Sequence, residues 1–219
     1  MPPPGLKDSV ALAHPLAAGL AEGLEKMGLE LGEAVQAQLL AYLDLLAKWN
    51  RSYNLTAVRK PEQMLVRHLF DSLAIHPFLR GPQILDVGSG AGLPGIPLAL
   101  ACSGHDFTLL DSNSKKTRFI TQAVAELGLD NVTVVQSRVE AYEAAGFDTI
   151  VSRAFSTLAE FAHGAQPLLA ADGILLAMKG VYPDTELAEL PAPFRRVQTI
   201  QLQVPDLDAE RHLLIIQRD

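Results

Sequence analysis

A short apolar segment that runs into a cluster of glycines constrains this chain more than any other feature. Residues 84–87 read Ile-Leu-Asp-Val, and residues 88–95 read Gly-Ser-Gly-Ala-Gly-Leu-Pro-Gly. Glycine tolerates positive φ and lets a ligand approach the backbone, so this order predicts a strand, a tight loop and the start of a helix. Bare N–H groups at a helix start attract polar or anionic ligand atoms. The segment therefore indicates a nucleotide-type cofactor and favours an enzyme.

The loop fits two kinds of cofactor. Gly90, Gly92 and Gly95 satisfy the dinucleotide pattern G-x-G-x-x-G, and Asp111 follows about twenty residues later, where an acid that binds ribose hydroxyls is expected. Asp86 lies two residues before the first glycine. A carboxylate there would meet the amino group of a methionine moiety, which favours S-adenosylmethionine over a pyrophosphate. A nicotinamide-dependent oxidoreductase stays open as the alternative.

Beyond the loop, short apolar runs alternate with helical patterns, which is typical of a parallel sheet with helices on both faces. Strands are expected at residues 83–87, 107–111, 133–135, 149–152 and 174–178, and helices at 94–102, 114–127, 158–166 and 184–190. No helix separates the last two expected strands, 197–204 and 213–217, so they predict an antiparallel hairpin. The expected fold is α/β, the Rossmann-like sheet of class I S-adenosylmethionine-dependent methyltransferases closed by that terminal hairpin.

Residues 1–80 are expected to form an N-terminal helical extension, and residues 81–219 the methyltransferase domain. Three helices are predicted in the extension, at residues 6–27, 33–51 and 61–76. In the second helix, apolar residues recur at helical spacing and predict a face that packs on the rest of the protein. In the third, Arg67 and Asp71 are four residues apart and can form a surface ion pair.

The charge of the chain is distributed unevenly. The net charge is −7, which by itself argues against a nucleic-acid partner. Residues 48–80, however, carry six basic and two acidic side chains, with Trp49, Tyr53 and His68 interleaved. Lys48 and Arg51 open this segment. It is either a surface that faces RNA or an ordinary solvated helix face.

A single cysteine, Cys102, excludes an intramolecular disulfide and fits a reducing compartment. Nothing at the start of the chain resembles a signal peptide, and no apolar run approaches the ~20 residues of a membrane-spanning helix. The expectation is a cytoplasmic protein without membrane contact and without a metal site. The sequence does not indicate an oligomeric state.

The residues after the fourth expected strand, Ser152-Arg-Ala-Phe155, occupy the rim where a methyl donor would meet its acceptor. They lack the Asn or Asp and the two prolines typical of enzymes that methylate exocyclic amines of bases. Cys102 is badly placed to attack a pyrimidine ring. An acceptor that is already nucleophilic, such as N7 of guanine, needs only alignment with the sulfonium methyl. Candidates at the rim are Arg153, Phe155 and Lys179, and no catalytic side chain beyond these positioning groups is identified.

Taken together, several segments resemble one known family, the RsmG or GidB family of bacterial 16S ribosomal RNA guanine-N7 methyltransferases. The matching segments are Lys48-Trp-Asn50, Tyr53-Asn-Leu-Thr56, Met64-Leu-Val-Arg-His68, Asp71-Ser72, residues 86–97, Leu109-Leu-Asp-Ser112, Gln136-Ser-Arg-Val-Glu140, Ser152-Arg-Ala-Phe155, Lys179-Gly180 and Arg211-His-Leu213. The resemblance implies methyl transfer from S-adenosylmethionine to N7 of guanine 527 in 16S rRNA. The substrate would be the 30S subunit or an assembly intermediate.

The resemblance also implies roles for individual residues. It places the cofactor around Gly88, Leu93, Asp111, the Val139-Glu140 pair and Arg153, and it places Arg67 and His68 at the mouth of the active site. Together with the residues read from the loop, the expected cofactor set is Asp86, Gly88, Ser89, Gly90, Gly92, Leu93, Asp111, Ser112, Val139, Glu140 and Arg153. The expected RNA-contacting set is Lys48, Arg51, Arg67, His68, Phe155 and Lys179. A ribosome-assembly factor that binds the cofactor without turnover is the remaining alternative.

Overall fold

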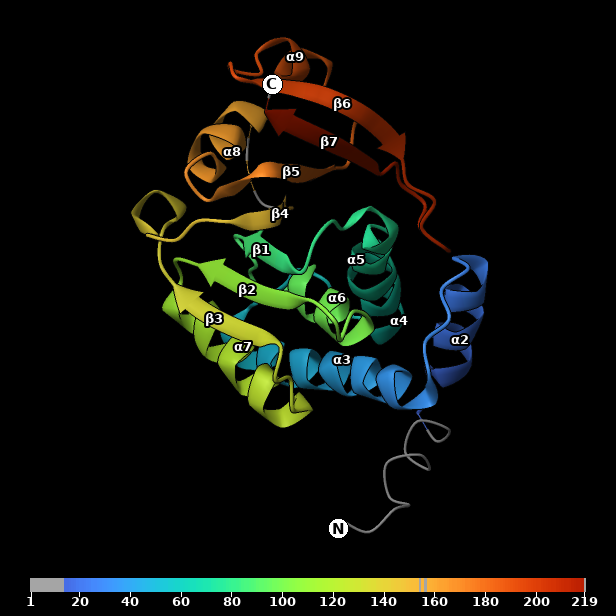
Figure 1. Cartoon of the computed structure of the whole chain (residues 1–219). Helices are drawn as coiled ribbons and strands as arrows, with labels where there is room; N and C mark the ends of the chain where they lie inside the picture. Colours follow the sequence, from blue (N-terminus) through green and yellow to red (C-terminus); the bar gives the residue numbers. More distant parts are fainter. Residues whose placement is uncertain (1–13, 154, 156, 219) are drawn as a thin grey trace.

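The computed structural model describes residues 14–153, 155 and 157–218, in which one twisted sheet is flanked by helices (Figure 1). Seven strands form the sheet in the order β3-β2-β1-β4-β5-β7-β6. Their bounds are β1 Gln83–Val87, β2 Asp106–Asp111, β3 Val132–Gln136, β4 Phe147–Ser152, β5 Leu169–Lys179, β6 Phe194–Gln201 and β7 His212–Arg218. The first five strands are parallel, and β7 runs antiparallel to both β5 and β6. This confirms the predicted fold class and its terminal hairpin.

The helices follow the expected order with shifted ends. They are α2 Ala17–Lys26, α3 Glu33–Tyr53, α4 Pro61–Met64, α5 Asp71–Leu73, α6 Gly95–Ala101, α7 Ser114–Leu127, α8 Leu158–Ala165 and α9 Asp184–Ala188. Short 3-10 turns occur at η2 His76–Phe78 and η3 Val139–Ala141. Residues 6–13 of the first expected helix lie outside the described residues. In the described part of the chain, no helix has the length and apolarity needed to cross a membrane.

The strands alternate their side chains between two apolar layers, as the period of a strand requires. On β1, Ile84 packs into the layer that contains α3, α6 and α7, whereas Leu85 and Val87 pack into the layer that contains α8. Burial on both faces explains why the central strands read as continuous apolar runs rather than as an alternating pattern.

Strand β6 occupies Phe194–Gln201 and not residues 197–204, so its predicted bounds are wrong by three residues at each end. Its partner sets its limits, because Phe194 pairs with Arg218 and Gln201 pairs with His212. This register is a long-range property that the local sequence pattern does not contain.

The helix predicted at residues 61–76 is interrupted by a π-helical segment, η1 Leu65–Phe70. A π turn closes over five residues, and such turns are frequent at functional sites. The predicted ion pair between Arg67 and Asp71 is wrong. Arg67 is exposed, whereas Asp71 is buried and pairs with Arg153, which follows β4, and with Arg211, which precedes β7.

Helix α3 joins the N-terminal helices to the sheet through its predicted apolar face. Leu39, Tyr42 and Leu46 are fully buried, and the ring of Trp49 lies 5.7 Å from that of Phe119 on α7. The Tyr42 hydroxyl donates a 2.7 Å hydrogen bond to the carbonyl of Ala91 in the glycine loop. The helices before β1 thus share one core with the sheet and support the loop directly, and a boundary near residue 80 stays a proposal about chain organisation.

We expect Tyr42→Phe to lower the free energy of unfolding by about 1 kcal/mol, because the buried Ala91 carbonyl loses its hydrogen-bond donor. Urea denaturation followed by circular dichroism measures the change. The matched control is Tyr53→Phe on the same helix, a half-buried tyrosine for which no hydroxyl hydrogen bond is found among the described residues. Equal stability of Tyr42→Phe and the parent protein would contradict the bracing role.

Candidate functional site

Three adjoining cavities lie beyond the carboxyl ends of β1, β2, β4 and β5. Ligands of open parallel sheets bind at this edge, where the strand order reverses, here between β1 and β4. The first cavity has a volume of about 260 Å³, the middle cavity about 230 Å³ and the outer cavity about 340 Å³. The first and middle cavities share Gly88 and Lys116, and the middle and outer cavities share His68 and Arg153. The three form one row along the sheet edge.

The glycine loop uses most of its own N–H groups internally. Gly88 and Ser89 donate to the carbonyl of Leu110 at 2.8 and 3.1 Å, and Gly92 donates to the carbonyl of Ser89 at 2.7 Å. Gly90 donates to a carboxylate oxygen of Asp111 at 2.9 Å. The expectation that these N–H groups are bare for a ligand is wrong. The loop instead brings its backbone to the cavity walls at Gly88 and Gly90, whose φ values of 71° and 61° suit glycine.

Asp86 lies behind the loop and not in the wall of any of the three cavities. Its carboxylate is 0% exposed, and its Oδ2 accepts a 2.8 Å hydrogen bond from the N–H of Gly95 at the start of α6. A Cβ on Gly95 would lie 2.8 Å from this oxygen and from Leu109, so only glycine lets α6 approach the sheet so closely. Burial raises the pKa of Asp86 to about 7. Asp86 thus braces the loop, and its contact with a cofactor amino group stays a prediction.

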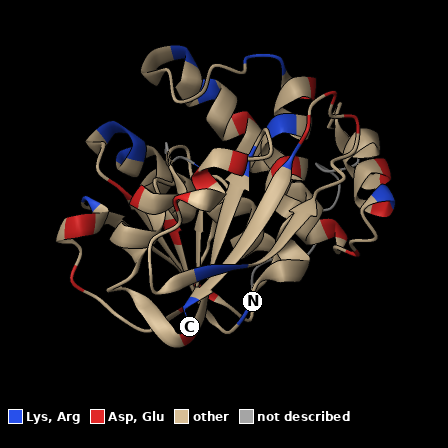
Figure 2. Cartoon of the chain, turned by 90° about the horizontal axis from the view of Figure 1, so that it is seen from above, with Lys and Arg blue, Asp and Glu red and all other residues tan. Residues whose placement is uncertain are grey.

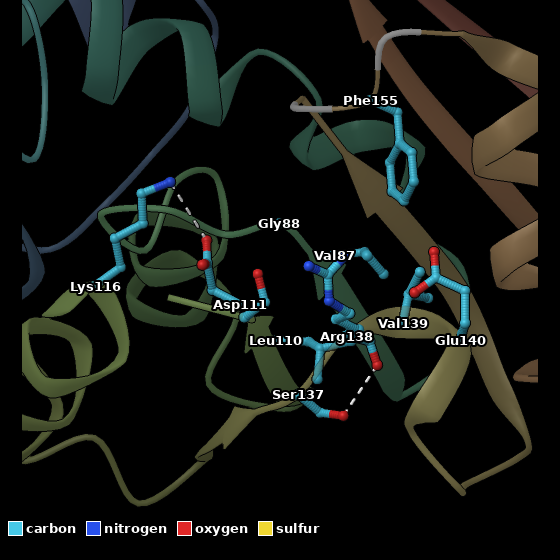
Figure 3. Close-up of a pocket in the computed structure, with 11 residues that line it drawn as sticks. Val87, Gly88, Leu110, Asp111, Lys116, Ser137, Arg138, Val139, Glu140 and Phe155 are labelled. Atoms are coloured by element: carbon cyan, nitrogen blue, oxygen red, sulfur yellow. Dashed lines mark hydrogen bonds and ion pairs between the residues drawn. The ribbon is translucent and has the colours of Figure 1, made fainter. Parts of the chain in front are cut away.

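Asp111 forms one side of the first cavity (Figure 3). Its Oδ1 accepts a 2.8 Å hydrogen bond from the N–H of Asn113, its Oδ2 accepts the bond from Gly90, and Lys116 Nζ lies 3.7 Å from Oδ2. The carboxylate is therefore held firmly, while each oxygen keeps a lone pair for another donor. Val139 and Glu140 lie across the cavity from Asp111 in Figure 3.

Phe155 also lines the first cavity, beside Val139 and Glu140 (Figure 3). Its ring packs on Phe161 with the centroids 5.2 Å apart. Phe155 lies at the first cavity, and its contact with the RNA acceptor stays a prediction. Ala154, its neighbour in the expected rim, lies outside the described residues.

His68 and Thr56 line the middle cavity and come from the helical extension. The Nε2 of His68 lies 3.0 Å from the hydroxyl of Thr56, and the N–H of Thr56 donates to Oδ1 of the buried Asn50 at 2.9 Å. His68 is only 4% exposed, and burial together with the nearby Arg153 cation lowers its pKa to about 4. The ring is therefore neutral at physiological pH.

The outer cavity is rich in cations with defined partners. Arg153 donates to Asp71 at 3.2 Å and to the carbonyl of Arg67 at 3.3 Å. Lys179 Nζ lies 2.8 Å from Glu186 on α9, so its charge is balanced by that carboxylate. Arg67, His68 and Gly180 complete much of the wall. Among the described residues, no group of three or more His, Cys, Asp or Glu side chains is arranged to hold a metal ion.

A comparison with known proteins decides the family. The GidB family, described as rRNA small subunit methyltransferase G, matches residues 35–214. A relative of that name from Ectopseudomonas mendocina is 54% identical over 202 residues, which cover 91% of this chain and 94% of the relative. A second relative of that name, from Nitrosococcus oceani, is 53% identical over 196 residues, which cover 89% of this chain and 92% of the relative. This chain belongs to the GidB family. As a member, it is an S-adenosylmethionine-dependent methyltransferase, which confirms the resemblance and the expected cofactor.

Solved structures agree with this GidB-family assignment at the level of fold. A SAM-dependent methyltransferase from Aquifex aeolicus has a TM-score of 0.55 at 18% identity, and covers 72% of this chain and 93% of its own. M. jannaschii TYW2 in complex with AdoMet has a TM-score of 0.53 at 12% identity. The match covers 68% of this chain and 75% of the TYW2 chain. At such identities the likeness concerns the fold alone.

The residues of the row fit S-adenosylmethionine. The apolar Val87, Leu110 and Val139 and the held carboxylate of Asp111 suit an adenosine, and the glycine loop leads from the first cavity into the middle one. When bound, the cofactor supplies an electrophilic methyl group on a sulfonium. The loop N–H groups already donate within the protein, which disfavours a pyrophosphate.

Most of the predicted cofactor residues of this GidB-family protein lie in the row. Ser112, Val139 and Glu140 line the first cavity, Ser89, Gly90 and Leu93 the middle one, and Arg153 the middle and outer ones. Asp86 and Gly92 line none of the three, and neither do the predicted RNA contacts Lys48 and Arg51, which are exposed on α3. Sequence reasoning missed Thr56, Asp71, Lys116 and Arg211 as site residues, although three of them fall in the matching segments.

We expect Asp111→Asn to weaken binding of S-adenosylhomocysteine about tenfold or more. An amide cannot accept from Gly90 and Asn113 on both sides and still accept from a ribose hydroxyl. Isothermal titration calorimetry measures the affinity. Asp106→Asn, at the other end of β2 where the side chain is exposed, is the matched control and should bind like the parent protein. Full affinity in Asp111→Asn would remove Asp111 from the cofactor site.

The lowered pKa of His68 predicts a pH-dependent stability. The unfolded chain takes up a proton at about pH 6.5 and the folded protein only at about pH 4, so folding loses stability as pH falls through this window. The stability difference between the parent protein and His68→Gln should fall by about 2 kcal/mol from about pH 7 to about pH 5. Urea denaturation at both pH values measures it. The raised pKa of Asp86 has the opposite effect on stability, but this effect is the same in both proteins and cancels in the difference. A stability difference that does not change with pH would mean that His68 keeps its ordinary pKa in the folded protein.

Proposed function

We propose that this GidB-family protein transfers a methyl group from S-adenosylmethionine to N7 of guanine 527 in 16S rRNA, with the 30S subunit or an assembly intermediate as substrate in the cytoplasm. Family membership supports methyl transfer to rRNA of the small subunit. The N7 atom and the position of the guanine come from the sequence resemblance, and the chemistry of the outer cavity supports the choice of atom.

The side chains of the outer cavity, where the acceptor would bind, support this proposal. Among the described residues of the outer cavity, Asp71 already pairs with two arginines and His68 has a pKa near 4. The neutral His68 is a weak base near neutral pH, and both oxygens of Asp71 already accept hydrogen bonds from arginines. N7 of guanine has an in-plane lone pair and no proton to lose, so such a cavity only has to align it with the methyl group.

Exposed cations of the helical extension support contact with RNA. Lys48 and Arg51 lie near the end of α3, Arg59 and Lys60 lie in the connection to α4, and Arg67 lines the outer cavity. Arg80, the last cation of the same basic segment, lies at the opposite edge of the sheet, where its N–H donates to Thr149 near the start of β4. Figure 2 shows basic and acidic positions interspersed over many helices and loops. The proposed RNA surface therefore narrows to residues 48–67.

The test is methylation of purified 30S particles that lack the modification, with S-adenosylmethionine carrying a labelled methyl group. We expect label in 16S rRNA, and 7-methylguanosine after digestion, identified by mass spectrometry. Particles that already carry the modification are the control and should accept no label. Another methylated nucleoside would refute N7. No transfer despite S-adenosylhomocysteine binding would favour the assembly factor, and thermal stabilisation by NADH alone would favour the oxidoreductase.

A further inference from the structure

One buried carboxylate in the outer cavity holds two arginines that are distant in sequence. Asp71 begins α5 directly after the π-helical segment, and its side chain is only 3% exposed. Its Oδ1 accepts a 2.7 Å hydrogen bond from Nε of Arg211, and its Oδ2 accepts a 3.2 Å hydrogen bond from Nη1 of Arg153. Arg153 follows β4, and Arg211 directly precedes β7. The cluster therefore ties the helical extension to both halves of the sheet.

The cluster has an excess of positive charge on the side of the cavity. A buried carboxylate requires charged partners, and one guanidinium per oxygen meets that need while leaving two cations for one anion. The side chains of Arg153 and Arg211 are 28% and 22% exposed, and both line the outer cavity. Lys179 does not add to the excess, because Glu186 lies 2.8 Å from its Nζ.

The guanidinium of Arg211 is held through two of its three nitrogens, and no partner for the third is found among the described residues. Its Nε bonds Asp71, and its Nη1 donates at 2.8 Å to the carbonyl of Glu210. Fixing these two nitrogens sets the plane of the group, and a guanidinium of fixed plane is suited to the oxygens of a phosphate. Arg211 lines the outer cavity but neither of the other two, which separates it from the residues that suit the adenosine.

We propose that Arg211 binds a backbone phosphate at the target nucleotide of the RNA, and that Asp71 is the positioning residue that fixes the Arg211 guanidinium for this contact. This inference rests on the proposed function, because it assigns an RNA contact to the acceptor side of the same site. Positioning Arg211 also gives a function to the hydrogen bond between Asp71 and an arginine 140 positions away in the chain.

Steady-state methylation of 30S particles by Arg211→Gln, Arg211→Lys, Asp71→Asn and the double variant tests the proposal. We expect Arg211→Gln to raise the KM for the particle about tenfold, with the affinity for S-adenosylhomocysteine unchanged, and Arg211→Lys to recover part of the loss. Asp71→Asn should raise the same KM, and adding Arg211→Gln to it should add little, because both changes act through one guanidinium. Arg80→Gln, an exposed arginine at the opposite sheet edge, should behave like the parent protein.

The outcomes separate this proposal from the proposed function. If the parent protein does not methylate the particles, the proposed function fails before any variant is compared. If it does, an unchanged KM in Arg211→Gln overturns the phosphate contact. Loss of S-adenosylhomocysteine affinity in Arg211→Gln would assign the arginine to the methionine carboxylate and overturn it as well. Additive effects of the two changes would overturn the positioning role of Asp71. If Asp71→Asn does not fold, the two Arg211 variants still decide the phosphate contact.

Discussion

The whole site depends on hydrogen bonds that fix the backbone of the glycine loop on the side away from the cavities. Asp86 accepts from Gly95 at the far end of the loop, the Leu110 carbonyl accepts from its near end, and Tyr42 reaches the Ala91 carbonyl from α3. Because these hydrogen bonds form within the protein and glycine adopts positive φ readily, the loop keeps its shape without help from a ligand. What it presents to the cavities is a preformed wall, which suits a nucleoside better than it suits a pyrophosphate.

Much of the fold was predictable because its signals are local. The short apolar runs of the strands and the helical spacing between them predict most of the elements, and the carboxyl ends of parallel strands bring the loop and Asp111 together. The limits of β6 were not predictable, because its partner β7 sets them. The π-helical segment was also not predictable, since residues 65–70 carry ordinary helical apolar spacing.

The first cavity, which suits the methyl donor, was largely predictable from the sequence. The outer cavity, where the acceptor would bind, was much less so. Sequence reasoning found the first cavity because its residues follow consecutive strands. It missed the ion cluster around Asp71, because the two arginine partners lie 82 and 140 residues away and only the fold brings them together. It gave Asp71 a surface partner in Arg67 for the same reason, since helical spacing describes a straight α-helix and does not describe burial.

The helical extension and the sheet contribute to different parts of the site. The strands and the glycine loop build the first cavity, whereas Thr56, His68 and Asp71, all from the segment before β1, face the middle and outer cavities. A sheet edge that holds a common methyl donor cannot by itself distinguish one acceptor from another, so discrimination among acceptors requires residues that the donor site does not use. In this protein the helical extension supplies many of them, and the same extension braces the donor loop through Tyr42. A change in the packing of α3 is therefore transmitted to both sides of the site.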